Sequence, residues 1–216
     1  AGKGAEEFAA HPKAALSMIM EDRHVRDELA VRGIKSRTDK MVSPPSLSGC
    51  RVACDEEELD LGGLTVVFQE ALGHSPGNIL VQIRETNTLL VSDSLGNHYP
   101  GRGFFPTFFT GFHDYMATID RLEKRHPQKM GLAHNGFFET IEAIDEIFRH
   151  ARQAAIDVRN HIIQSDGNNE DIAEELFTFY YTDELAVYSP QNIRNCCRLL
   201  VRRIRESDAV RPAMPR

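Results

Sequence analysis

The stretch "LTVVFQEALGHSPGN", residues 64–78, joins an apolar segment to a histidine that begins a turn. Residues 64–71 are short, rich in Val and Leu, and bounded by turn residues, which is typical of a strand. Gly73, Pro76 and Gly77 mark the turn, and His74 stands at its start. A single histidine in this place is most simply interpreted as a polar surface residue. A chemical role for His74 therefore needs partners from elsewhere in the chain.

Two further predicted strands end in the same way. The segment "TLLVSD" (88–93) closes on Asp93, and "KMGLA" (129–133) is followed directly by His134. If the ends of these strands meet at one rim, they bring together two imidazoles and a carboxylate, a set suited to zinc or a similar divalent ion. The structural alternative is that Asp93 stabilises its turn and that both histidines are hydrogen-bonded loop residues.

The distribution of apolar residues predicts an α/β part followed by a helical part. Strands are also expected at 14–20 ("AALSMIM") and 78–85, and a helix at 113–125. From residue 141 onward, apolar residues recur every three or four positions, which predicts a long helix ending near Ser165. A second helix is expected over roughly 169–180, and Ser189-Pro190 is a favourable start for a third. We therefore predict a domain over residues 1–140 and a three-helix extension over 141–216.

A long aromatic-rich segment, "GNHYPGRGFFPTFFTG" (96–111), follows the Asp93 strand and is expected to be a loop. Its position suggests an apolar wall beside the strand ends. Arg102 in the same segment would supply a cation for an anionic group of a ligand. The alternative for the phenylalanines is packing in the core. The candidate substrate pocket consists of His98, Tyr99, Arg102, Phe104 and Phe105.

The composition is that of an ordinary globular protein and excludes several classes. A formal charge of −7 argues against nucleic-acid binding, because phosphate contacts need a basic surface. No apolar run approaches about 18 residues, so no membrane span is expected. The four cysteines form neither a CxxC nor a zinc-finger spacing, and we interpret them as reduced thiols in a cytoplasmic protein.

Taken together, these segments resemble the metallo-β-lactamase superfamily. The resemblance rests on "GHSPGN", then "LLVSDSLG", then a helix and a strand ending in "GLAHNG". The opening "AGKGAEEFAAHP" is also similar to the helix that follows the first metal motif of this family, His-x-His-x-Asp-His. The resemblance covers roughly residues 1–140 and implies part of an αββα sandwich, of mixed α/β (α+β) class, followed by the helical extension.

The resemblance also implies a metal centre and an activity. His74 corresponds to a ligand of the first metal, Asp93 to the catalytic carboxylate that bridges both metals, and His134 to a ligand of the second. The implied cofactors are two divalent ions, with zinc expected and iron or manganese as alternatives. The implied reaction is hydrolysis of an ester-type carbonyl by a metal-bound hydroxide. The helical extension resembles those of members that act on acyl thioesters or lactones, which favours a small-molecule substrate of that kind.

One departure from the family pattern leaves a second function open. The 216 residues contain no His-x-His, so we expect the first metal motif to lie just before Ala1 and the chain to begin partway through the domain. The alternative is a non-catalytic protein of the same fold that uses its C-terminal helices for partner binding or for forming a homodimer. A redox role, as in relatives with di-iron sites, is a third and weaker hypothesis, because no flavin-domain signature is present.

Overall fold

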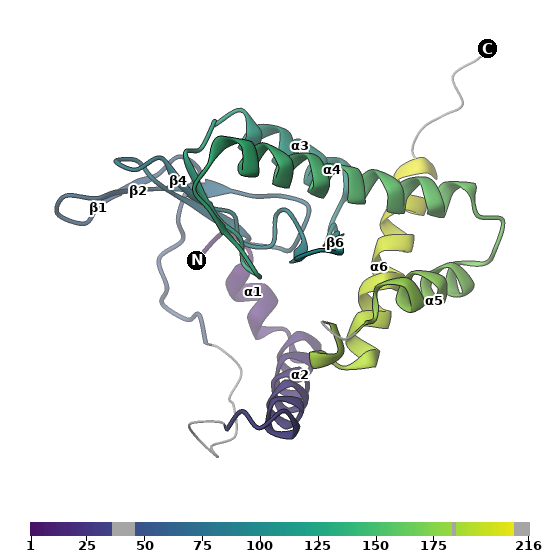
Figure 1. Cartoon of the computed structure of the whole chain (residues 1–216). Helices are drawn as coiled ribbons and strands as arrows, with labels where there is room; N and C mark the ends of the chain where they lie inside the picture. The colour runs from purple at the N-terminus through teal and green to yellow at the C-terminus, as the bar shows by residue number, and fades with distance from the viewer. Residues whose placement is uncertain (36–45, 183–184, 210–216) are drawn as a thin grey trace, which may run out of the picture.

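The computed structural model describes residues 1–35, 46–182 and 185–209 (Figure 1). Its helices are α1 (Ala5–Ala10), α2 (Pro12–Val31), α3 (Phe112–Glu123), α4 (Ile141–Gln164), α5 (Asn169–Tyr180) and α6 (Pro190–Ala209), with a short 3-10 turn η1 (Leu185–Val187) before α6. Its strands are β1 (Glu58–Asp60), β2 (Thr65–Glu70), β3 (Ile79–Ile83), β4 (Thr88–Leu90), β5 (Asn97–Tyr99), β6 (Gly103–Phe105), β7 (Lys129–Gly131) and β8 (Phe137–Phe138).

In these residues the strands form one six-stranded sheet, in the order β1-β2-β3-β4-β7-β8, and a separate β5–β6 hairpin. The first four strands pair antiparallel in succession, and β4 pairs parallel with β7. A parallel pair needs a crossover connection, and here that connection contains α3. Because β2 and β4 are both antiparallel to β3, the strands β2, β4 and β7 run in the same direction. Their C-terminal ends therefore lie at one edge of the sheet.

Helices α3 and α4 cover one face of this sheet (Figure 1). Alternate residues of the strands point toward them, and Leu80, Leu89 and Met130 are fully buried. Ile119 of α3 and Ile144 of α4 belong to the same hydrophobic core. A sheet with helices on one face is half of an αββα sandwich, so this part of the expected fold is confirmed.

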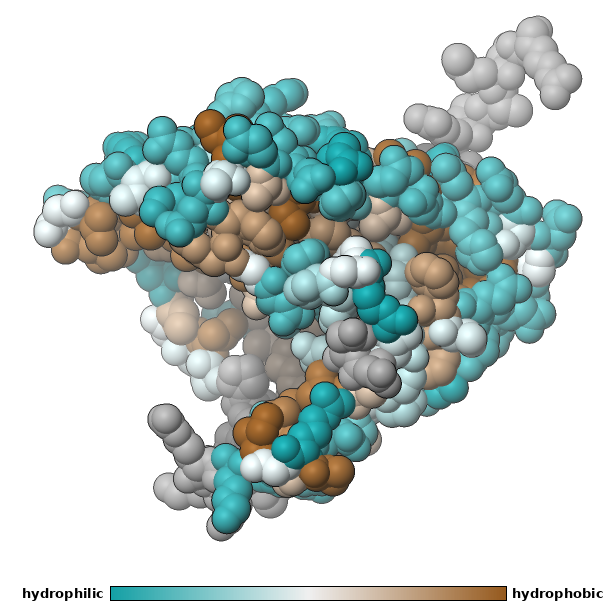
Figure 2. Space-filling view, in the orientation of Figure 1, coloured by the Kyte–Doolittle hydropathy of each residue, from teal (hydrophilic) through white to brown (hydrophobic). Residues whose placement is uncertain are grey.

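The opposite face of the sheet is also apolar but is less covered. Leu59, Leu90 and Phe137 are on this face and are exposed. Figure 2 shows hydrophobic residues gathered along the lower side of the region that holds β1 and β2. Strands that are apolar on both faces are typical of a sheet that is buried between two layers.

The helical extension is confirmed and continues the same core. Helix α4 runs past the sheet, α6 packs against α4, and α5 packs against α6 (Figure 1). The predicted inward face of α6, with Ile193, Cys197, Leu200 and Ile204, is buried. Ser189 caps this helix as expected, because its Oγ accepts a hydrogen bond from the Asn192 amide at 3.2 Å. Helix α4 begins near the predicted boundary at residue 140, but it also packs against strands β6 and β7, so the division into two domains stays a prediction.

Two predictions of local structure were wrong. Residues 14–20 are not a buried strand but part of α2, in which no residue is buried. Pro12 occupies the first turn of α2, where its missing amide costs nothing, and Ala, Leu and Met in the run favour helix. The aromatic segment 96–111 is not simply a loop, because it contains the β5–β6 hairpin.

Two expectations from composition can also be compared with the structure. Cys50, Cys54, Cys196 and Cys197 are all free thiols. Within residues 1–35, 46–182 and 185–209, no helix combines the length and the apolar character needed to cross a membrane.

Candidate functional site

The three strand ends singled out in the sequence meet at one edge of the sheet. His74 follows β2, Asp93 follows β4, and His134 follows β7, and these strands run in the same direction. The Nε2 atom of His134 lies 3.0 Å from Oδ1 of Asp93, and the Nε2 atom of His74 lies 3.8 Å from Oδ2. Each imidazole thus faces a different oxygen of the same carboxylate.

The His74 ring is held from behind by the segment that follows β6. Its Nδ1 lies 3.0 Å from the carbonyl oxygen of Thr107. Because a carbonyl oxygen can only accept, Nδ1 carries the hydrogen and donates a hydrogen bond to it. The ring of Phe109 packs against the imidazole, with the centroids 5.4 Å apart. This tautomer leaves the lone pair of Nε2 directed toward Asp93. A backbone carbonyl that orients a histidine in this way is a common support of metal ligands.

The same segment is tied to the backbone around both His74 and Asp93. The Thr107 hydroxyl donates to the carbonyl oxygen of Asp93 at 2.9 Å. The amide of Thr110 donates to the carbonyl of Gly73 at 3.0 Å. From α6, Nε of Arg203 donates to the carbonyl of Phe109 at 2.7 Å. We call residues 107–111 together with Arg203 the brace, and it links the C-terminal helix to the candidate site.

Sequence reasoning missed the brace. The one available signal was Thr107, a lone hydroxyl among the phenylalanines of "GFFPTFF". It is 3% exposed, so its hydroxyl needs a partner. No pattern in the neighbouring sequence indicates that Arg203 binds the backbone of residues 107–111.

His134 has fewer supports than His74. It lies on the turn between β7 and β8, where the amide of Leu132 donates to the carbonyl of Gly136 at 2.9 Å. Its neighbour Asn135 has a φ of 57°, a left-handed conformation that asparagine tolerates. Asn135 is joined to His98 by two hydrogen bonds, of 2.9 and 3.1 Å. The side chain of His134 is 36% exposed, against 16% for His74.

The surroundings shift the three pKa values in different directions. Burial lowers the pKa of His74, although the nearby Asp93 opposes that shift. The hydrogen bond to Asp93 raises the pKa of His134. Burial on its own would raise the pKa of Asp93, but the hydrogen bond from His134 and the two neighbouring imidazoles lower it overall. The site therefore favours an ionised carboxylate between a neutral and a more basic imidazole.

The donor set is chemically suited to a divalent cation. A neutral His74 that donates through Nδ1 turns an electron-rich Nε2 toward a carboxylate oxygen, 3.8 Å away. That separation is too long for a hydrogen bond, and a cation between the two atoms would relieve their repulsion. In the part of the chain that the structure describes, however, no group of three or more His, Cys, Asp or Glu side chains is arranged to hold one ion. The imidazoles approach separate oxygens of Asp93 and do not converge on a single point.

The candidate pocket residues are only partly brought together. His98, Arg102 and Phe104 line a groove of about 720 Å³ that also borders α4. Phe105 is 1% exposed and packs in the core against Tyr180, with ring centroids 4.8 Å apart. Tyr99 is half-buried and does not line the groove. Phe105 is therefore a core residue, as the alternative interpretation of the phenylalanines predicted.

Comparison with known proteins identifies the fold. No model of a protein family and no curated protein matches the sequence. Among solved structures, an archaeal metallo-β-lactamase superfamily protein from Sulfolobus tokodaii matches 95% of this chain and 69% of its own, at 16% identity and a TM-score of 0.51. A metallo-β-lactamase family protein from Thermus thermophilus matches 97% of this chain and 65% of its own, at 17% identity and a TM-score of 0.57. The chain has the metallo-β-lactamase fold.

A third structure with this fold is a double mutant of a sec-alkyl sulfatase. It matches 98% of this chain at 16% identity, with a TM-score of 0.60, but only 38% of its own length. The chain thus spans about two thirds of the first two relatives and much less of the sulfatase. At these identities the similarity shows the fold alone. Any activity must be inferred from the residues of the candidate site.

Proposed function

We propose that the protein is a metal-dependent hydrolase that acts on an ester-type carbonyl, with a thioester or a lactone as the substrate. The observation that carries this proposal is the placement of Asp93 between two imidazoles, each opposite a different carboxylate oxygen. This arrangement places imidazole nitrogens and carboxylate oxygens side by side, as donors that a divalent cation would use. Zinc suits imidazole and carboxylate donors best, and iron or manganese are the alternatives.

In this proposal the chain's own residues hold and orient the metal. His74, Asp93 and His134 would hold the metal, and the His-x-His-x-Asp-His motif implied by the resemblance would supply the remaining ligands. The brace fixes the tautomer and direction of His74 before any metal binds. A divalent ion held there supplies Lewis-acid polarisation of a carbonyl and a bound water with a pKa of about 7.

The proposal is tested by the metal content of the full-length protein. After loading with zinc, iron or manganese and removal of free ions, the metal per chain is measured in the wild type and in His74→Ala and Asp93→Ala variants. Since each variant removes a ligand, we expect affinity to fall by at least about tenfold, with Asp93→Ala affected most. His113→Ala, an exposed histidine on α3, is the matched control. Unchanged metal content in both ligand variants would refute the hydrolase.

Activity assays then address the substrate. The loaded protein is compared on thioesters, lactones and phosphodiesters, and we expect turnover of one of the first two classes. Turnover of phosphodiesters alone would refute the ester-type substrate while leaving the metal centre in place.

A non-catalytic role is the second candidate, and one observation favours it. Within the described residues, the three side chains do not form a group arranged to hold one ion. Under this alternative, the C-terminal helices form a homodimer or bind a partner. A protein that sediments as a dimer and takes up no metal would support this candidate over the hydrolase.

A further inference from the structure

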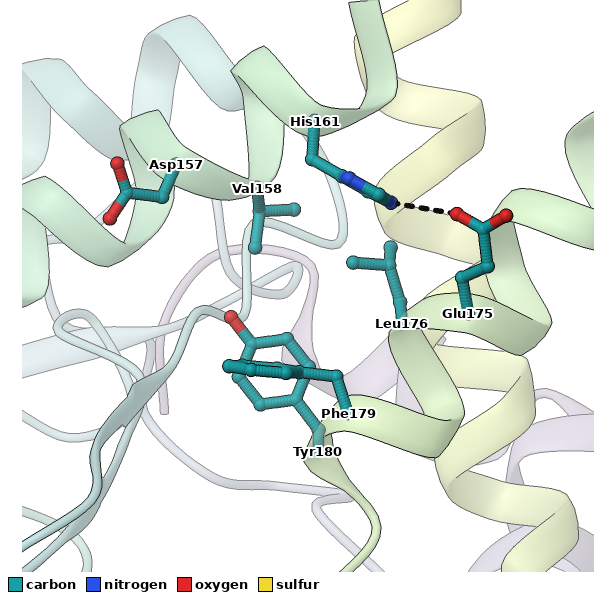
Figure 3. A pocket seen from close by; sticks show the side chains of 7 residues that line it. All are labelled: Asp157, Val158, His161, Glu175, Leu176, Phe179 and Tyr180. Atoms are coloured by element: carbon teal, nitrogen blue, oxygen red, sulfur yellow. Dashed lines mark ion pairs between the residues drawn. The ribbon is translucent and has the colours of Figure 1, made fainter. Parts of the chain in front are cut away.

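A cavity of about 380 Å³ lies between α4 and α5 (Figure 3). Val158 of α4 and Leu176, Phe179 and Tyr180 of α5 give it a largely apolar lining. On one side, an ion pair of 3.1 Å between His161 and Glu175 joins the two helices, drawn as a dashed line in Figure 3. Phe179, which also lines the cavity, is 75% exposed.

This cavity lies next to the groove beside the β5–β6 hairpin. Both are lined by Asp157, Phe179 and Tyr180. The groove follows α4 past Ala154 and Ile147 to Phe104, a stretch in which most of the lining is apolar. Charged residues of both signs also line it, with Glu146 and Asp157 against Arg102. The groove therefore selects for an apolar ligand and not for a particular charge.

The hairpin end of the groove adjoins the candidate site. His98 lines the groove and packs against Phe104, with ring centroids 4.9 Å apart. The same His98 is joined by two hydrogen bonds to Asn135, the residue directly after His134. The hairpin end of the groove is therefore close in space to His134, and the groove extends from there along α4 toward the α4–α5 cavity.

We propose that this groove binds an aliphatic tail of the substrate, with the ester-type carbonyl at the His134 end and the end of the tail between α4 and α5. This inference rests on the proposed hydrolase and narrows its substrate to acyl compounds with a medium-length unbranched chain. The groove, of about 720 Å³, and the cavity, of about 380 Å³, each lie within the range of small-molecule sites, about 300–1,000 Å³. Each methylene moved from water into such a lining should increase affinity by about three- to fourfold.

The test measures tail binding without metal or turnover. N-alkylacetamides with hexyl, octyl and decyl chains are titrated into the metal-free full-length protein by calorimetry. We expect the dissociation constant to fall stepwise with chain length. Ala154→Phe, which fills the groove, and Phe179→Ala, which removes an exposed wall, should each weaken binding of the decyl compound by about tenfold and flatten the dependence on length.

The matched control is Phe137→Ala, which removes a ring that is 55% exposed and lies outside the groove. This variant should bind the decyl compound as the wild type does. Equal binding of all three chain lengths, or wild-type affinity in both groove variants, would overturn the proposal.

The two proposals fail in different ways. A protein that loads metal but shows no dependence on chain length overturns the groove and leaves the hydrolase. A protein that binds long chains through the groove but takes up no metal overturns the hydrolase, and with it the assignment of the tail to a substrate. In an active protein, Ala154→Phe should raise KM for a decanoyl ester by a larger factor than KM for an acetyl ester.

Discussion

The two sides of Asp93 are built differently. On one side, His74 is largely buried, its Nδ1 is bonded to the Thr107 carbonyl, and the brace ties its surroundings to α6. On the other side, His134 is more exposed, and its neighbour Asn135 is hydrogen-bonded to the hairpin residue His98. Both imidazoles nevertheless reach the same carboxylate.

This difference indicates a division of roles within the site. Ligands whose rotamers are locked by packing and hydrogen bonds are preorganised, and they bind with little loss of entropy. A more exposed side chain on a turn adjusts more easily when a ligand enters or leaves. We infer that the His74 side is rigid and that the His134 side is adjustable.

The largest expected effect comes from a glycine on the rigid side. Gly73 has a φ of 104°, and a Cβ added there would lie 2.3 Å from the backbone of Tyr115 in α3. Gly73→Ala should therefore cost more than about 3 kcal/mol in the free energy of unfolding, because the conformation is strained and α3 must move. Denaturant unfolding of the metal-free protein measures this cost.

Gly136 provides the matched substitution on the other side. A Cβ there would meet the far end of the Phe138 ring, at 2.5 Å, and that ring can turn away. Gly136→Ala should cost about 1 kcal/mol or less. Equal costs for the two alanine variants would contradict the distinction between a rigid and an adjustable side.

A smaller effect is expected from the anchor of the brace. Arg203→Met removes the hydrogen bond from the guanidinium to the Phe109 carbonyl but keeps an apolar side chain of similar length. We expect a loss of about 2 kcal/mol, the usual contribution of a hydrogen bond with a charged donor. Because Phe109 packs on the His74 ring, the NMR signals of that imidazole should also move.

Arg202 is the control for this substitution. It pairs with the same Glu206 as Arg203 does, but its side chain is 64% exposed and it has no bond to the brace. Arg202→Met should change stability by less than about 0.5 kcal/mol and leave the His74 signals in place. If the two methionine variants behave alike, α6 does not support the site through Arg203.

The sequence predicted the fold well where burial imposes a period. The strands at 64–71 and 129–133 and the helices of the extension have one face or both faces in the core, so their apolar residues recur regularly. The prediction failed for residues 14–20, because α2 buries none of its residues and its apolar run reflects no core contact. The two-residue strand β8 is too short to produce a pattern.

The candidate site was predictable only in part, for a related reason. His74, Asp93 and His134 each follow an apolar strand, and strands that run in the same direction bring their ends to one edge. The brace acts instead through backbone carbonyls, which every residue has, and through Arg203, which is 94 positions from Phe109. Neither the carbonyl hydrogen bonds nor the contact from Arg203 produces a recognisable pattern in the local sequence. The metal-ligand roles themselves stay a prediction.

The smallest expected effect is a difference in how the two histidines titrate in the metal-free protein. Burial lowers the pKa of His74 below its usual value of 6.5. As the pH falls below 6.5, the unfolded chain therefore binds a proton at His74 more readily than the folded protein, and the folded state loses stability. The hydrogen bond to Asp93 raises the pKa of His134 above 6.5. Its contribution to stability is therefore present below pH 6.5 and is lost as the pH rises through its folded-state pKa.

An NMR titration of the imidazoles should thus give a midpoint above 6.5 for His134 and below 6.5 for His74. His134→Gln should then reduce stability more at pH 5.5 than at pH 8, by less than about 1 kcal/mol, because the side chain is more than a third exposed and solvent screens its charge. A glutamine variant that is equally stable relative to the wild type at both pH values would mean that His134 gains nothing from Asp93. In that case His74 and His134 would differ only in how deeply they are buried. The position of His134 would then depend on the hydrogen bonds between Asn135 and His98.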